Sequence, residues 1–261
     1  MLWRIPGADG HFDPYKVMVS ELMLQQTQVE RVASKYSAFL EQYPTVQALA
    51  AAELGDVLKV WNGLGYNRRA KYIWQTAQKV VADYDGHFPE TVEELKRLPG
   101  VGPNTAGAVV AYAYDKPVLF IETNVRTVII HHFVKNKIDI PDSDIVEILK
   151  AVAPHPNIDK RTVQGARLGP REFYWALMDY GSYLKKTEGN LNRASRHYTK
   201  QSKFHGSKRQ LRGHVIRELA KGPKSLAVLQ KEISDDRLPD ILDGLVREKM
   251  IVKHGMAYRL S

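Results

Sequence analysis

The stretch Leu95–Tyr114, LKRLPGVGPNTAGAVVAYAY, has the pattern of two helices joined by a glycine-rich turn. A first helix is expected over Thr91–Leu98. Pro103 suits the first position of a second helix, which runs through the small residues of Thr105–Ala113. Between the two helices, Gly100-Val101-Gly102 suits a tight connection with positive φ. The stretch therefore predicts a helix–hairpin–helix.

The hairpin leaves backbone N–H groups bare at the start of the second helix, where the helix dipole is positive. Such a site can hold a phosphate without reading a base sequence. We expect Gly100, Val101, Gly102 and Thr105 to form it, and a purely structural αα-hairpin is the alternative. LPGVG followed by TAGAV resembles the helix–hairpin–helix of the endonuclease III and MutY superfamily of DNA base-excision glycosylases, which implies a DNA phosphate as the ligand.

The composition is that of a strongly basic globular protein. The chain has 261 residues, a hydrophobic content of 44% and a formal net charge of +9. This charge favours a polyanionic partner, although RNA-binding proteins share it and charge alone does not select DNA. No apolar run approaches the roughly 20 residues of a membrane span, and the N-terminus lacks the apolar stretch of a signal peptide. We therefore expect a soluble cytoplasmic protein with no membrane partner, associated with the nucleoid if it is bacterial.

The chain contains no cysteine, which excludes disulfides, thiolate nucleophiles and iron–sulfur or zinc–thiolate sites. MutY and endonuclease III carry four cysteines around an iron–sulfur cluster in the interval that corresponds to Ser182–Ser207. The resemblance therefore implies a relative without the cluster. We expect no cofactor and no metal, with this interval held by side-chain contacts alone.

Helical periodicity accounts for the body of the chain, and alternation typical of a β-strand occurs only near the C-terminus. The segment Pro154–Pro170 is interpreted as a loop because it is rich in Pro, Gly and basic residues. The body is therefore expected to be all-α, with about ten helices. Besides the hairpin, helices are expected over Pro14–Leu24, from near Gln28, over Thr45–Leu49, Leu54–Trp61, Arg68–Tyr84 and Glu122–Phe133, from Pro141 to before Pro154, and over Glu172–Leu184.

A basic segment leads to a small C-terminal module. Lys185–Arg212 contains nine Lys or Arg residues and one acid, and is interpreted as an irregular connection that follows a phosphate backbone or as a plain solvated linker. Three helices are then expected over His214–Ala220, Ser225–Ile233 and Leu238–Lys249, followed by two strands around Gly255. This pattern indicates a winged helix, which binds DNA or serves as a protein-interaction module.

Two carboxylates are the groups that base excision would need. Glycoside hydrolysis commonly uses one acid to protonate the leaving group and a second, ionised, carboxylate to stabilise the cationic sugar. Removing a base from DNA breaks a related bond, after the base has left the stack. The sequence should therefore offer two acidic side chains in unfavourable surroundings.

Glu21 is the first candidate, because burial on its apolar helix raises the pKa of a carboxyl and favours a general acid. A Glu directed into water is the alternative. The surrounding SELMLQQTQV resembles the MutY signature around its catalytic glutamate. The resemblance makes Glu21 the general acid that acts on adenine, and it places Leu24, Gln26 and Thr27 beside the opposite base.

Glu122 is the second candidate. It opens a helix where the superfamily has an aspartate followed by Gly or Thr and then Asn or His; here the run is Glu122-Thr123-Asn124. The resemblance gives Glu122 the role of stabilising the oxocarbenium ion and positioning water, with Asn124 beside it. The side chain is one methylene longer than aspartate, and catalytic geometry is sensitive to fractions of an ångström. A Glu favoured by the helix dipole is the alternative.

Asn104 occupies the hairpin position where bifunctional members of the superfamily carry a lysine that forms a Schiff base. Asparagine cannot form one, so we predict a monofunctional glycosylase. The same resemblance implies further contacts to the base pocket or to the opposite base, by Trp3, Arg4, Leu64, Tyr66, Asn104 and Trp175.

These patterns predict an all-α, two-lobed helix–hairpin–helix glycosylase fold with a small C-terminal winged-helix-like module. The expected parts are a six-helix lobe over residues 13–116, a second lobe formed by 1–12 and 117–198, a basic linker over 199–212 and the module over 213–261. Glu21 and Glu122 should face each other across the cleft between the lobes.

The expected function is that of a monomeric, monofunctional DNA N-glycosylase that removes adenine mispaired with 8-oxoguanine from double-stranded DNA. Trp175 stands where adenine-specific relatives often have a Glu, so thymine or uracil opposite guanine, or an alkylated base, stays open as the target. A DNA-binding relative without catalysis is the other alternative, because the missing cluster and the basic tail also fit it. Nothing in the chain resembles the 8-oxoguanine recognition domain of long MutY proteins.

Overall fold

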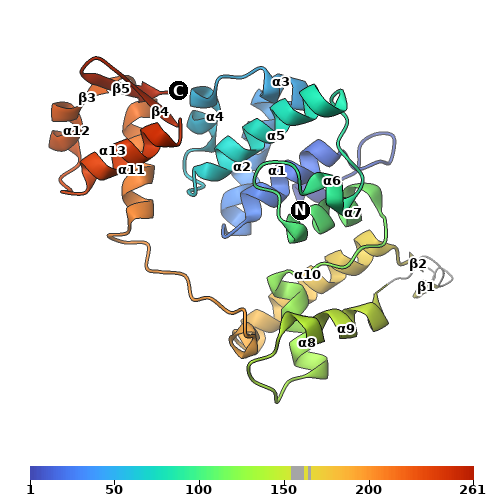
Figure 1. Ribbon diagram of the computed structural model, residues 1–261. Helices are drawn as coiled ribbons and strands as arrows, with labels where there is room; N and C mark the ends of the chain where they lie inside the picture. The colour runs from blue at the N-terminus through green and yellow to red at the C-terminus, as the bar shows by residue number, and fades with distance from the viewer. Residues whose placement is uncertain (154–161, 164–165) are drawn as a thin grey trace.

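The computed structural model in Figure 1 describes residues 1–153, 162–163 and 166–261. Helices dominate these residues, and no helix among them combines the length and the hydrophobicity of a membrane span. The chain forms a first lobe, coloured blue to green in Figure 1, then a second lobe below it, and last a red module beside the first lobe.

The first lobe is arranged around α1, which packs against α2, α5 and α7. Asp13 caps α1 by accepting the backbone N–H of Tyr15 at 2.9 Å, and Pro14 occupies the first turn. The lobe has seven helices, one for each helical stretch expected from the sequence and one more than the six-helix lobe expected as a whole, and α3 and α6 are single turns. They are α1 (Pro14–Leu24), α2 (Val29–Gln42), α3 (Val46–Ala50), α4 (Leu54–Trp61), α5 (Arg68–Tyr84), α6 (Val92–Leu95) and α7 (Pro103–Tyr114).

The helix–hairpin–helix consists of α6 and α7. The first helix ends at Leu95, earlier than expected, and turns lead from it to Gly100. Gly100 has φ +75°, and a Cβ there would lie 2.6 Å from the ring of Tyr72, so a side chain is excluded by both backbone and space. Gly102 has φ −88°, so the expectation of a positive φ holds for Gly100 and not for Gly102. Pro103 begins α7 as predicted.

The second lobe is built on the close packing of α8 and α10. A Cβ on Gly181 of α10 would lie 2.3 Å from the carbonyl oxygen of Asn124 on α8, so glycine sets the separation of these helices. The elements of this lobe are α8 (Thr123–Phe133), α9 (Asp142–Val152), α10 (Pro170–Thr187) and η2 (Leu191–Ala194), whereas η1 (Leu2–Arg4) contacts α1 of the first lobe. A separate core holds this lobe together, formed by Ile121, Ile129, Ile130, Val134, Ile140 and Ile145.

The predicted loop Pro154–Pro170 lies partly outside the described residues. Within it, β1 (Thr162–Val163) and β2 (Ala166–Arg167) pair antiparallel, and α10 begins at Pro170, before the expected Glu172. The interpretation as a loop is therefore wrong at these paired positions. Strands of two residues are too short to show the alternation from which a strand is predicted.

The interval that follows α10 is held by side-chain and backbone contacts together. The buried Asn192 donates through Nδ2 to Thr127 Oγ1 at 2.6 Å and to the Thr123 carbonyl at 3.2 Å. Ile140 exchanges backbone hydrogen bonds of 2.9 Å with Ala194 and Arg196. The expectation of side-chain contacts alone is thus wrong, because a short backbone pairing also joins the interval to the residues before α9.

The C-terminal module has three helices and a three-stranded antiparallel sheet of order β3-β5-β4. Its first helix begins at Lys208, so the expected linker 199–212 and the module boundary at 213 are both too far along the chain. β3 was not expected from the sequence. The elements are α11 (Lys208–Ala220), β3 (Lys224–Ser225), α12 (Leu226–Glu232), α13 (Leu238–Arg247), β4 (Ile251–His254) and β5 (Ala257–Leu260).

The module docks on the first lobe through α4. The backbone N–H of Gly55 donates to the carbonyl of Ser261 at 2.5 Å, and a Cβ on Gly55 would lie 2.6 Å from that oxygen. α11 and β5 both contact α4, and buried residues of the module join the core of the first lobe. Figure 1 shows the chain reaching this position from the second lobe through a long extended segment.

Candidate active site

A cavity of about 330 Å³ lies between the lobes, in the lower part of the range for small-molecule pockets. The N-terminal residues, α1, the end of α7, the start of α8, and α10 supply its walls. The residues that line it are Met1, Trp3, Arg4, Val17, Ser20, Glu21, Leu24, Thr27, Val29, Tyr112, Glu122, Asn124, Trp175, Met178, Asp179 and Ser182.

Glu21 projects into this cavity from the buried face of α1, between Ser20 and Leu22. Burial raises the pKa of Glu21 to about 8, and the charge of Glu122 adds to the rise, while Arg4 opposes it. Glu21 therefore holds a proton at neutral pH and is suited to act as a general acid.

Glu122 reaches the same cavity as the N-cap of α8, with one oxygen accepting the backbone N–H of Asn124 at 2.8 Å. Burial raises the pKa of Glu122 as well, but hydrogen bonds from the backbone of Asn124 and Thr123 and the charges of Arg126 and Lys185 oppose this rise. These groups favour the ionised form of Glu122 and limit the rise in its pKa.

An aromatic wall completes the cavity. Trp175 stacks on Tyr112 with ring centroids 6.0 Å apart, and the guanidinium of Arg4 lies 5.2 Å from the Trp175 ring. Arg4 also pairs with Asp179 at 2.7 Å. The cavity therefore offers a planar ligand aromatic rings as well as the two carboxyl groups.

Tyr112 is a lining residue that the sequence reasoning missed. Burial, followed by the charges of Glu21 and Glu122, raises the pKa of its phenol well above the ordinary value. Its hydroxyl thus stays protonated and can donate a hydrogen bond inside the cavity. The available signal was a large aromatic residue in a helix of otherwise small side chains, two residues from the end of α7.

The cavity unites part of the predicted site and leaves the rest elsewhere. Asn104 is exposed and lies outside the lining, and its Oδ1 accepts the backbone N–H of Ile121 at 3.3 Å. The prediction that Asn104 lies in the base pocket is therefore wrong. Its side chain instead holds the segment that leads into Glu122. Asn124 does line the cavity, where its amide approaches the Met178 sulfur at 4.0 Å.

Leu64 is also corrected by the structure. Its side chain is only 2% exposed and belongs to the core of the first lobe, so it presents no surface to an opposite base. Gln26 and Tyr66 remain accessible, and both have a positive φ, of 55° and 49°. They line a second concavity, described below, and not the cavity of Glu21.

Comparison with known proteins identifies the family of the chain. Residues 19–154 match the HhH-GPD superfamily of base excision DNA repair proteins. The chain belongs to this superfamily. The predicted resemblance to glycosylases of the endonuclease III and MutY type is thereby confirmed.

Curated relatives are named adenine DNA glycosylases. The protein of Mycolicibacterium smegmatis is 44% identical over 127 residues, which are 49% of this chain and 42% of the relative. The rat protein is 45% identical over 116 residues, which are 44% of this chain and 22% of the relative. The chain thus matches less than half of the length of either relative.

Solved structures support the fold. A thermostable thymine-DNA glycosylase superposes with a TM-score of 0.56 at 22% identity, covering 74% of this chain and 86% of that one. A trapped endonuclease III–DNA covalent intermediate gives 0.52 at 19% identity, covering 68% and 76%. These likenesses confirm the predicted helix–hairpin–helix glycosylase fold.

The superfamily hairpin lies against the turn that follows α1. Gln25 Nε2 donates to Thr105 Oγ1 at 3.1 Å, across the start of α7. Within the described residues, the backbone N–H groups of Asn104 and Thr105 have no protein acceptor, and Gly102 before them is exposed. The N-terminus of α7 can thus receive an anion.

Arg69 is a second residue that the sequence reasoning missed. It is buried on α5, and its guanidinium makes six hydrogen bonds to two separate segments of the chain. It donates to the carbonyls of Leu22 and Met23 in the last turn of α1, to the Gln25 carbonyl and Thr27 Oγ1 just after this helix, and to the carbonyls of Leu64 and Gly65. Burial lowers the pKa of Arg69 to about 10. Arg69 therefore positions the loop of Gln26 relative to the loop of Tyr66.

No cluster of three or more His, Asp or Glu side chains suited to a metal occurs in the part of the chain that the structure describes. The cavity offers two carboxyl groups and an aromatic wall, which can support acid–base chemistry by side chains.

Proposed function

We propose that the protein is a monofunctional DNA N-glycosylase that removes adenine mispaired with 8-oxoguanine, without an iron–sulfur cluster or another cofactor. The observation that carries the proposal is the pair formed by Glu21 and Glu122 in one cavity, the first raised in pKa to about 8 and the second held by backbone N–H donors. The names of the curated relatives support adenine as the target base.

In the proposed mechanism, an extruded adenine enters the cavity and lies against the stacked rings of Trp175 and Tyr112. Glu21 donates its proton to a ring nitrogen, and the electrons of the glycosidic bond pass to the departing base. The carboxylate of Glu122 stabilises the cationic sugar. A water then adds to the anomeric carbon, and Glu122 accepts the proton that this water releases.

A monofunctional reaction fits the lining of the cavity. A lyase step needs an amine that attacks the sugar and forms a Schiff base. None of the described residues that line the cavity is a lysine, and Asn104 offers an amide. The products are therefore a free base and an intact strand with an abasic site.

The proposed partner is double-stranded DNA with a mispaired or damaged base, bound by a monomer in the cytoplasm or on the nucleoid. The hairpin residues Gly100, Val101, Gly102 and Thr105 are proposed to hold a phosphate at the start of α7. The exposed Gly102 and the unpaired N–H of Thr105 support this role, whereas Val101 is buried and fixes the turn.

Another target base is favoured by one observation. Trp175 fills the wall of the cavity where adenine-specific relatives often have a Glu, and the acid of α10 that lines the cavity, Asp179, is paired with Arg4. Thymine or uracil opposite guanine, or an alkylated base, is the second candidate. A DNA-binding role without catalysis would also fit the fold, and the same experiment separates it from both.

A single-turnover panel tests the proposal. Duplexes carry A opposite 8-oxoguanine, A opposite G, T or U opposite G, or an alkylated base, and each is scored with and without alkali. Breaks that need alkali and occur only at A are expected. They should vanish in Glu21→Gln and persist in Glu30→Gln, an exposed site on α2. Breaks at another base would show that the glycosylase has a different target base. Binding to the duplexes without any break would show that the protein binds DNA without catalysis.

A further inference from the structure

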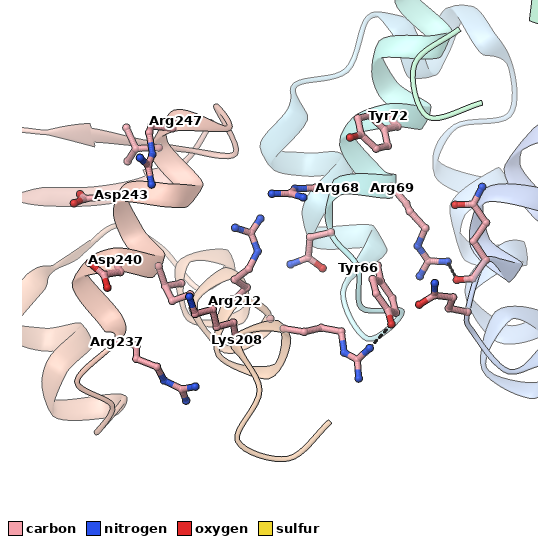
Figure 2. Close-up of a pocket in the computed structure, with 17 residues that line it drawn as sticks. Tyr66, Arg68, Arg69, Tyr72, Lys208, Arg212, Arg237, Asp240, Asp243 and Arg247 are labelled. Carbon is pink, nitrogen blue, oxygen red and sulfur yellow. Dashed lines mark hydrogen bonds between the residues drawn. The ribbon is translucent and has the colours of Figure 1, made fainter. Parts of the chain in front are cut away.

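A groove with a volume of about 1130 Å³ lies between the first lobe and the C-terminal module (Figure 2). Tyr66 and Arg68 come from the wall formed by the first lobe, and Arg237 and Arg247 come from the wall formed by α13 and the residue before it. We call this concavity the module groove. It is distinct from the cavity that holds Glu21 and Glu122.

The module groove is strongly basic. Seven Arg or Lys side chains line it, against two acids, Asp240 and Asp243. Lys208 and Arg247 are exposed and have no ion-pair partner among the described residues. Both lie on the wall formed by the module, and unpaired surface cations attract a polyanion such as a sugar–phosphate backbone.

The two walls are held at a fixed separation. The carboxylate of Glu248 accepts from Arg68 of the first lobe at 2.7 and 3.0 Å and from Arg212 of the module at 2.7 and 3.0 Å. Burial opposes the ionised form, but the hydrogen bonds of the two arginines lower the pKa of Glu248 to about 2. The carboxylate of Glu248 is therefore charged at all physiological pH values, and the groove is formed before any ligand arrives.

The turn after α1 divides the module groove from the active-site cavity. Leu24 and Thr27 line the cavity, whereas Gln25 and Gln26 line the groove. Since the extruded nucleotide belongs to the strand on the cavity side, the other strand of the duplex must lie on the side of Gln26. The C-terminal module also approaches the first lobe on this side, through Arg209, whose guanidinium lies 4.9 Å from the ring of Tyr66.

We propose that the module groove binds the sugar–phosphate backbone of the DNA strand opposite the excised nucleotide, with Lys208 and Arg247 as phosphate contacts. This inference rests on the proposed function for the identity of the two strands. It assigns the C-terminal module to the DNA-binding surface through the groove wall of α11 and α13.

The first test is the salt dependence of binding to a duplex that carries a stable abasic-site analogue opposite 8-oxoguanine. Each phosphate contact contributes about 0.9 to the slope of log K against log salt, so Lys208→Ala/Arg247→Ala should lower the slope by about 1.8. Arg217→Ala/Lys231→Ala removes the same charge from exposed sites of the module outside the groove and should leave the slope unchanged. Equal slopes for the two double variants would overturn the proposal.

The second test identifies the strand. Neutral methylphosphonate linkages replace phosphates in either the lesion strand or the opposite strand of the same duplex. Linkages in the opposite strand should weaken binding of the wild-type protein and have little effect on Lys208→Ala/Arg247→Ala. If the double variant instead became insensitive to linkages in the lesion strand, the assignment of the groove to the opposite strand would be contradicted. If the protein excises no base from any duplex of the panel but the strand effect is still observed, the proposed glycosylase activity is rejected and the groove remains a DNA-binding site.

Discussion

The charge of Glu122 raises the pKa of Glu21, although the two residues belong to helices α8 and α1 in different lobes. Burial is the larger cause of the rise, and it places the pKa of Glu21 at about 8. Of the two carboxyl groups, only Glu122 accepts hydrogen bonds from backbone N–H groups, and these bonds oppose the rise in its pKa. This difference makes the proposed chemistry testable by pH.

The pH profile of excision should be bell-shaped. The alkaline limb reports loss of the Glu21 proton near pH 8, and the acid limb reports protonation of Glu122, whose pKa is raised by burial. Replacing Glu122 by Gln should slow excision and move the alkaline limb to lower pH, since it removes the charge that raises the pKa of Glu21. Single-turnover rates between pH 4 and pH 10 measure both limbs. An alkaline limb at the same pH in both proteins would contradict the coupling.

Glu21 should lower stability at alkaline pH. Its folded pKa of about 8 lies above the model value of 4.5, so its contribution is fully present below pH 4.5 and is lost as pH rises through about 8. The loss is at most about 5 kcal/mol. Glu21→Gln should therefore raise the free energy of unfolding at pH 9 relative to wild type and change it little at pH 4. Denaturant unfolding at the two pH values measures this, with Glu30→Gln as the control that should show no pH-dependent gain.

Removing Arg69 should be far more damaging than removing its neighbour Arg68. Arg69→Ala leaves several buried carbonyls without a donor and is expected to cost about 3–5 kcal/mol. Arg68 is exposed and its pair with Glu248 is expected to contribute at most about 1 kcal/mol. Denaturant unfolding compares the two variants. Similar losses would show that the two loops do not depend on the guanidinium of Arg69.

Gly181→Ala should disturb the site from a distance. The added Cβ meets the backbone of Asn124, which cannot move without shifting the start of α8, so a loss of about 1–3 kcal/mol and slower excision are expected. Gly213→Ala is the matched control within α11, because nothing lies within 4 Å of its Cβ, and it should stabilise the helix by about 0.5–1 kcal/mol. Unfolding and single-turnover rates of both variants check this. A neutral Gly181→Ala would mean that the two helices can separate freely.

Local signals explain what the sequence could predict. The bounds of α1 and α5 agree with those expected, because caps, proline positions and helical periodicity lie within the segments themselves. The proximity of Glu21 and Glu122 was anticipated from the resemblance. The sequence did not show that the backbone N–H groups of Asn124 and Thr123 would oppose the rise in the pKa of Glu122 and not of Glu21.

Contacts between distant segments explain what the sequence could not predict. The acceptors of Arg69 at the end of α1 and just beyond it lie more than 40 residues before Arg69, so nothing near Arg69 in the sequence marks it as a buried side chain. β3 exists because Lys224 and Ser225 pair with Tyr258 and Ala257. The burial of Leu64 likewise follows from tertiary packing, which overrides its place in a glycine-rich loop.

The route of the chain after α10 has a mechanical consequence. Asn192 anchors the chain to α8 in the second lobe, and α11 then fixes it to α4 in the first lobe, so the intervening segment forms a strap across both (Figure 1). Any hinge motion that opens the cavity must therefore stretch this strap or pull the module from α4. The strap couples the movement of the lobes to the position of the module. A duplex that moves the lobes apart therefore also exerts a force on the distant C-terminal sheet.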